Sequence, residues 1–414
     1  MAEQRATHHL VSTVDDLAWI FCLRGSDVAF NPVFLGHALI EPERATLFVG
    51  EGKVDDALRA ALEADGVVLA PYGDAAARVA SLTPSDRLLV DPNRVTFGMV
   101  EGTRAKLLES VNPSTFAKSR KVDAELEHVR RAMEQDGAAM CEFYAWFEAA
   151  LGRETITEIT VDEKLSAARS RREGFVGLSF PTIAGFNANG ALPHYKATEA
   201  SNKTIEGDGL LLIDSGGQYL GGTTDITRVW PIGNVSDAMR RDYTLVLKGT
   251  LNLSRTRYPE GTPGPMLDAL ARQPLWNESL EYGHGTGHGV GYFLNVHEGP
   301  QTISKAPTAP FHSMRAGMLT SIEPGLYRPG RWGIRIENLA ASVPAPSDEF
   351  GEFLQFETLS LCPIDTRLID RSLLRDDEVQ WLDDYHAEVR RRLEPLVEGA
   401  AKDWLIERTE PLSA

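Results

Sequence analysis

Residues 209–225 read GLLLIDSGGQYLGGTTD, two short runs that each end in an aspartate. Asp214 closes the first run and Asp225 closes the second, and four glycines surround the midpoint between them. Glycines there favour a turn, because they adopt backbone conformations that other residues avoid. The segment therefore predicts a β-hairpin. If that hairpin is symmetric, the two aspartates lie on neighbouring strands with Cβ atoms roughly 4.5–5.5 Å apart.

A second segment, residues 319–338 (LTSIEPGLYRPGRWGIRIEN), follows the same plan. Glu323 and Glu337 are equidistant from Gly330, which follows Pro329 in a pair typical of turns. This segment predicts another hairpin with a pair of acids. Carboxylates held so close together repel each other unless a cation or a shared proton lies between them.

Between the two hairpins lies a histidine- and glycine-rich segment, residues 281–300 (EYGHGTGHGVGYFLNVHEGP). It holds three of the ten histidines: His284, His288 and His297. Its glycine spacing matches neither the dinucleotide-binding nor the phosphate-loop pattern. HEGPQ is not the H-E-x-x-H zinc motif, and no G-x-S-x-G nucleophile motif is present. Histidines beside paired acids favour a metal site.

Ligand chemistry narrows the kind of metal site. Four carboxylates with one or two imidazoles form an oxygen-rich set that suits Mn²⁺ or another divalent first-row ion. Four negative charges would balance two divalent cations, which predicts a dinuclear centre. Two metals about 3.5–4 Å apart can hold a bridging hydroxide and polarise a carbonyl at once. That chemistry hydrolyses peptides or amides.

The rest of the chain predicts two domains, because 414 residues are too many for one compact core. Residues 1–117 alternate short apolar runs with helical patterns, which is typical of an α/β layer domain. Strands are expected at 9–14, 37–40, 46–50, 67–70 and 87–90, and helices at 15–23, 54–64 and 74–82. The segment 112–123 (NPSTFAKSRKVD) is the expected boundary.

Residues 118–414 predict an α+β domain, since helices and glycine-rich strands are segregated along the chain. The expected helices lie at about 122–151, 161–173, 236–258, 263–276 and 376–408. The strands and hairpins fall between them and include the two hairpins with paired acids.

The charge composition argues against nucleic acid and anionic membranes as binding partners. With 42 basic and 59 acidic residues and a net charge of -17, the chain has no basic block for nucleic acid or an anionic membrane. Three scattered cysteines are too few for a disulfide framework or a cysteine-based zinc site. The sequence contains no signal-peptide core and no run long enough to span a bilayer. We expect a cytoplasmic protein.

The motifs resemble those of the pita-bread metallopeptidases, and within them the Xaa-Pro aminopeptidases of the long cytosolic type. HGTGHGVG, FLNVHEGP, the EPG at Glu323 and GIRIEN match that branch, as does DSGGQYLGGTTDITR. LRGSDVAFNPVF and the WLIERTEPLS tail extend the resemblance over essentially the whole chain. The long branch carries a further N-terminal domain, so residues 1–117 correspond to its middle, creatinase-like domain.

The resemblance implies a ligand set of Asp214, Asp225, His288, Glu323 and Glu337 for two divalent metals. Manganese is the expected metal, with cobalt or zinc as alternatives. Asp225 and Glu337 would bridge both metals, and Glu323 would also move the proton of the bridging water. His194 would lie near the substrate, while His284 and His297 would line the proline pocket. Tyr327 is a further candidate for that pocket, and Arg335 would orient a ligand carboxylate.

The implied activity is removal of the N-terminal residue from a peptide whose second residue is proline, by a homodimer. A prolidase restricted to dipeptides shares the fold and the ligands. A creatinase-type amidinohydrolase and a non-enzymatic binding module share the fold without this ligand set, and a catalytically impaired fragment is a further alternative.

Overall fold

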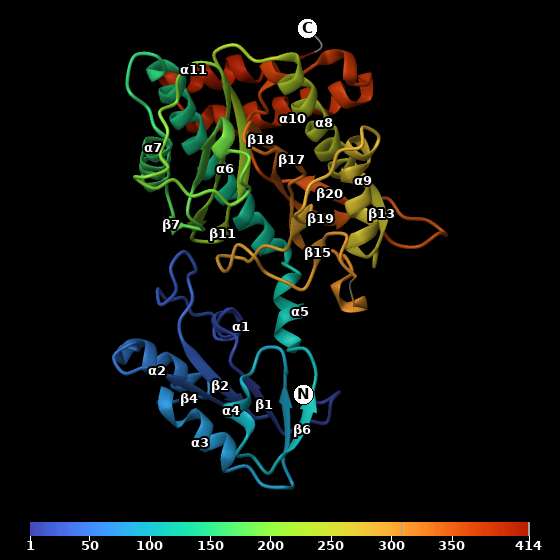
Figure 1. Cartoon of the computed structure of the whole chain (residues 1–414). Helices are drawn as coiled ribbons and strands as arrows, with labels where there is room; N and C mark the ends of the chain where they lie inside the picture. Colours follow the sequence, from blue (N-terminus) through green and yellow to red (C-terminus); the bar gives the residue numbers. More distant parts are fainter. Residues whose placement is uncertain (308, 413–414) are drawn as a thin grey trace. The chain divides into compact units, whose positions relative to one another are not determined.

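The computed structural model of the chain describes residues 1–307 and 309–412 (Figure 1). Thr308 and the last two residues of the predicted second domain, 413 and 414, lie outside the described part. The chain forms two compact units, Met1–Lys118 and Ser119–Ala414. The division between them falls inside helix α5 (Pro113–Ser119), within the 112–123 segment.

The first unit is an α/β layer built on one six-stranded mixed sheet, as the sequence predicts. The strand order is β4-β3-β2-β1-β5-β6. The pairs β3–β4, β1–β5 and β5–β6 are parallel, while β1–β2 and β2–β3 are antiparallel. The strands are β1 (His8–Val11), β2 (Gly36–Ile40), β3 (Ala45–Val49), β4 (Val67–Pro71), β5 (Arg87–Val90) and β6 (Lys106–Glu109). The helices are α1 (Val14–Ile20), α2 (Asp56–Ala64), α3 (Ala75–Ala80) and α4 (Phe97–Val100).

The five predicted strands and three predicted helices of this unit are confirmed. The first strand ends at Val11, earlier than predicted, because Val14 already begins α1. The sequence did not indicate β6, an edge strand whose residues are mostly exposed. Buried Leu10, Leu39 and Leu88 from the sheet pack with Val79 of α3 to form the core.

The second unit is an α+β structure of short antiparallel sheets and surrounding helices (Figure 1). Its four-stranded sheet has the order β13-β20-β19-β16, two three-stranded sheets have the orders β12-β9-β8 and β11-β10-β7, and two-stranded sheets are formed by β14-β15 and β17-β18. The helices are α6 (Asp123–Ala150), α7 (Glu158–Ser170), α8 (Asp237–Ser254), α9 (Gly264–Trp276), α10 (Asp376–Leu393) and α11 (Gly399–Arg408). The strands are β7 (Phe175–Leu178), β8 (Ile183–Phe186), β9 (Gly209–Ser215), β10 (Gly217–Tyr219), β11 (Gly222–Thr223), β12 (Ile226–Ile232), β13 (Arg257–Pro259), β14 (Gly287–His288), β15 (Thr302–Ile303), β16 (Leu319–Ile322), β17 (Gly325–Arg328), β18 (Trp332–Arg335), β19 (Asn338–Pro344) and β20 (Phe353–Thr358).

These helices lie where the sequence predicts helical segments, with one correction. Residues 376–408 form two helices, α10 and α11, and not one. The break falls at Pro395, which has no backbone N–H to donate, and at Gly399, whose φ of 53° is unfavourable for other residues. In the core, Trp230 of β12 packs against Tyr144 of α6 and Trp404 of α11, with ring centroids 4.1 and 5.7 Å away.

The first predicted hairpin exists, but its register differs from the symmetric expectation. Strand β9 pairs with β12 so that Asp214 faces Thr227, and Asp225 precedes β12. The turn is centred between Leu220 and Gly221, because Gly221 has a φ of 96° that other residues rarely adopt. Asp225 is therefore diagonal to Asp214. A shift of two residues keeps both acids on one face, since side chains alternate with a period of two.

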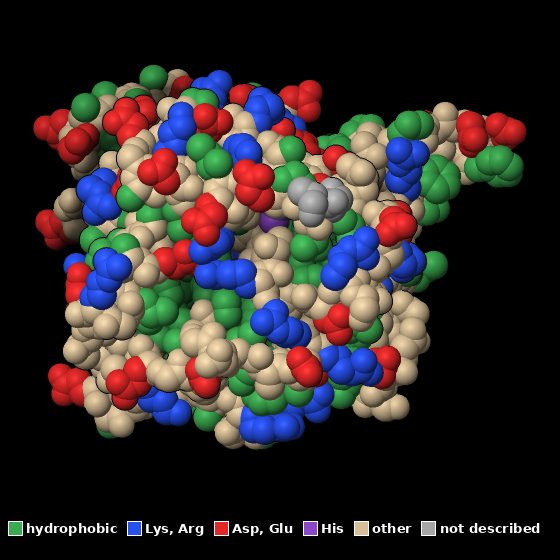
Figure 2. All heavy atoms as spheres, turned by 90° about the horizontal axis from the view of Figure 1, so that it is seen from above, with side chains coloured by type: hydrophobic (Ala, Val, Ile, Leu, Met, Phe, Trp, Pro, Cys, Tyr) green, Lys and Arg blue, Asp and Glu red, His purple; other side chains and the backbone are tan. Residues whose placement is uncertain are grey.

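The second predicted hairpin has the symmetric register. Gly325 pairs with Arg335 across β17 and β18, and Ile322 pairs with Asn338 across β16 and β19. One continuous register therefore places Glu323 opposite Glu337 at the junction of the two strand pairs. Beyond this region, the loop between β19 and β20 projects away from the unit in Figure 1. Figure 2 shows basic and acidic side chains interspersed over the face that it displays.

Candidate metal centre

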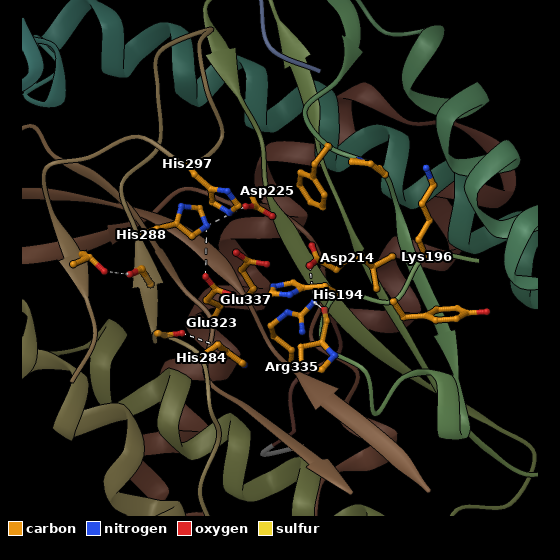
Figure 3. Close-up of a pocket in the computed structure, with 18 residues that line it drawn as sticks. His194, Lys196, Asp214, Asp225, His284, His288, His297, Glu323, Arg335 and Glu337 are labelled. Carbon is orange, nitrogen blue, oxygen red and sulfur yellow. Dashed lines mark hydrogen bonds and ion pairs between the residues drawn. The ribbon is translucent and has the colours of Figure 1, made fainter. Parts of the chain in front are cut away.

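A cavity of about 550 Å³ in the second unit joins the two hairpins and the histidine-rich segment (Figure 3). Its walls include nine of the ten residues predicted for the site: His194, Asp214, Asp225, His284, His288, His297, Glu323, Arg335 and Glu337. The tenth, Tyr327, lies behind His284 and donates a hydrogen bond to its Nε2 at 2.8 Å. Side chains from β9, β14 and β18, and from the positions between paired strands that hold Glu323 and Glu337, thus line one cavity.

Asp225, His288 and Glu337 form the closest group of potential ligands. Among the described residues, each of these three offers a ligand atom within 4.8 Å of the other two. The Nε2 atom of His288 lies 3.5 Å from Oδ2 of Asp225 and 3.5 Å from Oε1 of Glu323. In Figure 3 these side chains point toward one another.

The orientation of His288 is set by its own backbone. Its Nδ1 lies 2.9 Å from the carbonyl oxygen of Gly289, which can only accept a hydrogen bond. Nδ1 therefore carries the proton in the neutral ring, and the lone pair of Nε2 faces the acids. A lone pair directed at two carboxylates is the arrangement of a metal ligand whose second nitrogen is held by a carbonyl.

Electrostatics shows how unfavourable this group of acids is without a cation. Burial and the nearby carboxylates of Asp214 and Glu323 raise the pKa of Asp225 well above its ordinary value. Burial and Asp225 do the same to the pKa of Glu337. Burial also raises the pKa of Glu323, although His288 and Arg335 oppose the change. Acids with pKa values raised in this way gain most from bound cations, which stabilise their charged form.

Neighbouring side chains hold each carboxylate in place. Thr227 donates to Oε2 of Glu337 at 2.6 Å. Ser321 donates to Oε1 of Glu323 at 3.1 Å, and its oxygen accepts a hydrogen bond from the backbone N–H of His288. The sequence analysis missed both hydroxyls. Period-two alternation could have found them, because each lies two residues from a predicted ligand in an extended segment.

Arg335 connects Asp214 to the histidine wall. Its Nη2 donates to Oδ2 of Asp214 at 2.5 Å, and its Nη1 donates to the hydroxyl oxygen of Tyr327 at 2.6 Å. Tyr327 in turn donates to Nε2 of His284, whose Nδ1 lies 2.7 Å from the carbonyl oxygen of Gly285. Through these contacts Arg335 fixes the orientation of the Asp214 carboxylate.

The two remaining histidines of the segment are neutral at physiological pH. Burial lowers the pKa of His284 to about 4. Burial and the neighbouring His288 lower the pKa of His297 to about 4. The ring of His297 lies edge-on to that of His288, with centroids 4.3 Å apart. His194 is exposed and lines the same cavity as Lys196.

The donor set fits divalent cations. It combines four carboxylates with one imidazole whose lone pair is directed at them, and hard oxygen ligands with a nitrogen suit first-row divalent ions. The second oxygen of Asp214, Oδ1, is buried and has no hydrogen-bond partner among the described residues. A buried carboxylate oxygen in that state is the ligand atom a cation would satisfy.

Comparison with protein-family models identifies the chain. Residues 127–341 match the model of metallopeptidase family M24. This matched range contains every potential ligand described above. The chain belongs to the M24 metallopeptidases. Residues 1–125 match the creatinase/prolidase N-terminal domain, and residues 352–412 match the C-terminal region of peptidase M24. The two-part pita-bread architecture implied by the resemblance is confirmed.

Similar M24 proteins carry the names that the motifs suggest. The chain is 38% identical to Xaa-Pro aminopeptidase 1 of Dictyostelium discoideum over 100% of its own length and 67% of that protein's. It is 40% identical to a probable Xaa-Pro aminopeptidase P of Pyricularia oryzae, over 97% of this chain and 68% of the other. The chain thus spans about two thirds of the length of these curated relatives.

Solved structures of similar proteins agree with the assignment of the chain to the M24 family. A cytosolic X-prolyl aminopeptidase of Caenorhabditis elegans with a di-nuclear active site superposes with a TM-score of 0.94 at 33% identity, over 99% of this chain and 69% of that one. An Xaa-Pro dipeptidase of Bacillus anthracis reaches a TM-score of 0.69 at 24% identity, over 88% and 95% of the two chains, and shares the fold. Among the described residues, no helix has the length and apolar character needed to cross a bilayer.

Proposed function

We propose that the chain is a metal-dependent aminopeptidase that hydrolyses the bond between an N-terminal residue and a following proline. The observation that carries this proposal is the convergence of Asp225, His288 and Glu337 on one cavity, with Glu323 at 3.5 Å from His288. The Xaa-Pro aminopeptidase names of its relatives at 38–40% identity support the same reaction.

The ligand roles extend this proposal to two divalent ions, with Mn²⁺ as the expected metal. Asp225 and Glu337 would contact both ions, Asp214 one of them, and His288 with Glu323 the other. Bound there, the ions would activate a hydroxide and polarise the scissile carbonyl. The di-nuclear site of the related nematode enzyme supports the two-ion arrangement.

Glu323 would handle the proton of the reaction. Its carboxyl lies beside His288 and accepts a hydrogen bond from Ser321, which holds it at the cavity wall. A carboxylate held at this point of the wall can act first as a general base and then as a general acid. Glu323 would take a proton from the attacking water and deliver it to the departing proline nitrogen.

Recognition of proline follows from the neutral histidines. An X-Pro bond has no N–H and the proline ring is rigid, so its pocket needs flat apolar contacts and no acceptor for that hydrogen. His284 and His297 supply neutral rings, and Phe180, Pro181 and Ile183 add apolar surface to the same cavity. Tyr327 would act on this pocket through His284, and His194 would contact the substrate. The free amine would lie near the carboxylates, which favours N-terminal residues.

A cytoplasmic location and a homodimer complete the proposal. The cytosolic origin of the nematode relative and the three scattered cysteines support the location. The oligomeric state is tested directly by light scattering.

The deciding experiment compares kcat/KM on three peptides after metal removal and reloading with Mn²⁺. X-Pro-Y should be cut after its first residue, X-Ala-Y about 10–200-fold more slowly, because lost ring contacts are worth about 1–3 kcal/mol. An X-Pro dipeptide should be a poor substrate. Equal values for X-Pro-Y and X-Ala-Y would remove the proline assignment. Preference for the dipeptide would identify a prolidase, and inactivity on all three with metal bound would contradict the peptidase assignment.

A further inference from the structure

A fully buried carboxylate outside the metal centre contacts the segment that carries His194. Glu158 is the first residue of α7, and its side chain has no exposed surface. Residues 186–203 wrap around this carboxylate. The same segment supplies Pro193, His194 and Lys196 to the cavity wall (Figure 3).

Four groups of this segment donate hydrogen bonds to Glu158. Oε1 accepts from the backbone N–H of Phe186 at 2.7 Å and from Nδ2 of Asn189 at 3.0 Å, and Oε2 accepts from the hydroxyl of Tyr195 at 2.7 Å and the backbone N–H of Lys203 at 3.0 Å. The backbone N–H of Glu158 also donates to the carbonyl of Lys203 at 3.1 Å. Both ends and the middle of the segment are therefore attached to one side chain.

The segment is also held from the side of the metal centre. The carbonyl oxygen of Pro193 accepts a hydrogen bond from Nη2 of Arg335 at 3.4 Å. Gly190 packs so closely against β18 that a Cβ added at Gly333 would lie 1.7 Å from the Gly190 carbonyl oxygen. His194 itself is exposed, so its place depends on the backbone on either side of it. Tyr195, its neighbour, is the residue anchored to Glu158.

We propose that Glu158 is a positioning residue for the peptide-binding wall of the cavity. It fixes the 186–203 segment so that the imidazole of His194 meets a peptide group of the substrate. The assignment of His194 to substrate rests on the proposed function, whereas the attachment of the segment to Glu158 does not.

The variant Glu158→Gln keeps the shape of the side chain but replaces an accepting oxygen with an NH₂ group that faces donors. A misplacement of about 1 Å caused far from the chemistry can cost on the order of 100-fold, so we expect kcat/KM on X-Pro-Y to fall by about 10–100-fold with unchanged metal content. Glu158→Asp retains both oxygens and should recover part of the loss. In a His194→Ala background, Glu158→Gln should lower kcat/KM by less than about threefold, because residues acting through one another are not additive.

Asp136→Asn is the matched control. Asp136 is a buried carboxylate paired at 2.8 Å with Arg169, which also lies on α7 but is outside the cavity lining. This variant should lower stability as Glu158→Gln does, yet leave kcat/KM near the wild-type value. Equal losses of kcat/KM in the two variants, or full additivity of Glu158→Gln with His194→Ala, would reduce Glu158 to a purely structural group and overturn the proposal.

Hydrogen–deuterium exchange of the metal-loaded, peptide-free protein provides a readout that needs no peptidase activity. Glu158→Gln should increase deuterium uptake in peptides covering residues 187–203, and Asp136→Asn should not. Unchanged uptake would overturn the proposal even if activity fell. If Glu158→Gln raises deuterium uptake but the wild-type protein cuts no peptide, the proposed function is wrong. The attachment of the 186–203 segment to Glu158 would then still hold.

Discussion

Nη2 of Arg335 and Oδ2 of Asp214 lie 2.5 Å apart, and both side chains are buried. The two residues are 121 positions apart in the chain. Arg335 supplies a positive charge to these acids from within the protein. Its contact with Oδ2 leaves the other oxygen of Asp214, Oδ1, without a partner among the described residues and available to a metal. The pair therefore links the first hairpin to the second, and in the proposed ligand set it would orient Asp214 toward the metal.

Arg335→Met should destabilise the metal-free protein by about 3–5 kcal/mol, because it leaves the Asp214 carboxylate buried without its partner. Mn²⁺ should restore part of this loss, since bound cations replace the missing charge. Arg335→Lys should be intermediate, because one ammonium cannot reproduce the contacts of the guanidinium with Asp214, Thr227 and Tyr327. Urea unfolding with and without Mn²⁺ measures these differences. Equal stabilities of all three proteins would contradict the role given to the pair.

His288→Ala should lower the bound metal from two ions per chain toward one and reduce kcat at least about 100-fold, more than loss of a group behind a ligand. The fold should survive, because the hairpins keep their strand pairing. Metal content by mass spectrometry and turnover at saturating Mn²⁺ test this. His37→Ala in the first unit, where His37 contacts Ser12, is the control and should change neither quantity. Near-normal turnover of His288→Ala would exclude a ligand role.

Gly287→Ala should disrupt the centre through its backbone. A Cβ at Gly287 would lie 1.9 Å from the carbonyl oxygen of Ser321, so β14 must move away from β16 and carry His288 with it. Overpacking of this kind costs about 1–3 kcal/mol, and we expect weaker metal binding as well. Gly283→Ala is the matched control, because a Cβ there meets nothing within 4 Å. The thermal unfolding curves and the metal-binding curves of Gly287→Ala and Gly283→Ala should differ. Coincident curves would contradict the predicted steric clash.

Stability should depend on pH through His386, which is fully buried in α10. Burial lowers its pKa to about 4, and its Nε2 accepts a hydrogen bond from the backbone N–H of Ile364, which protonation would break. The unfolded chain binds the proton near its ordinary pKa of 6.5. The stability contributed by the neutral ring is therefore complete above about pH 6.5 and is lost as the pH falls through 4.

Comparison with His386→Gln isolates this contribution. The difference in unfolding free energy between wild type and variant should change by about 3 kcal/mol between pH 7 and pH 4, because each pKa unit is worth about 1.4 kcal/mol. Urea unfolding across that range measures it. Parallel pH profiles for the two proteins would show that His386 is not the responsible group.

Local patterns in the sequence predicted the elements that carry the site. Pro329-Gly330 places the second turn midway between Glu323 and Glu337, and the structure has that register. In the first hairpin the turn is displaced by one residue, which moves the strand partner of Asp214 by two, from Asp225 to Thr227. The glycines around the midpoint allow several turn positions, and sequence spacing does not choose among them. The edge strand β6 was missed since its residues form no buried apolar pattern.

The sequence by itself determined that the five predicted ligands lie on two hairpins and a glycine-rich histidine segment, because each of these is encoded within a stretch of about twenty residues. Only the tertiary structure decided what holds them in place. Thr227 and Glu337 are 110 positions apart, and Glu158 lies 37 positions from Tyr195. Such contacts form when separate elements pack and bury polar groups that must then find partners, and no local periodicity records which partner each group finds.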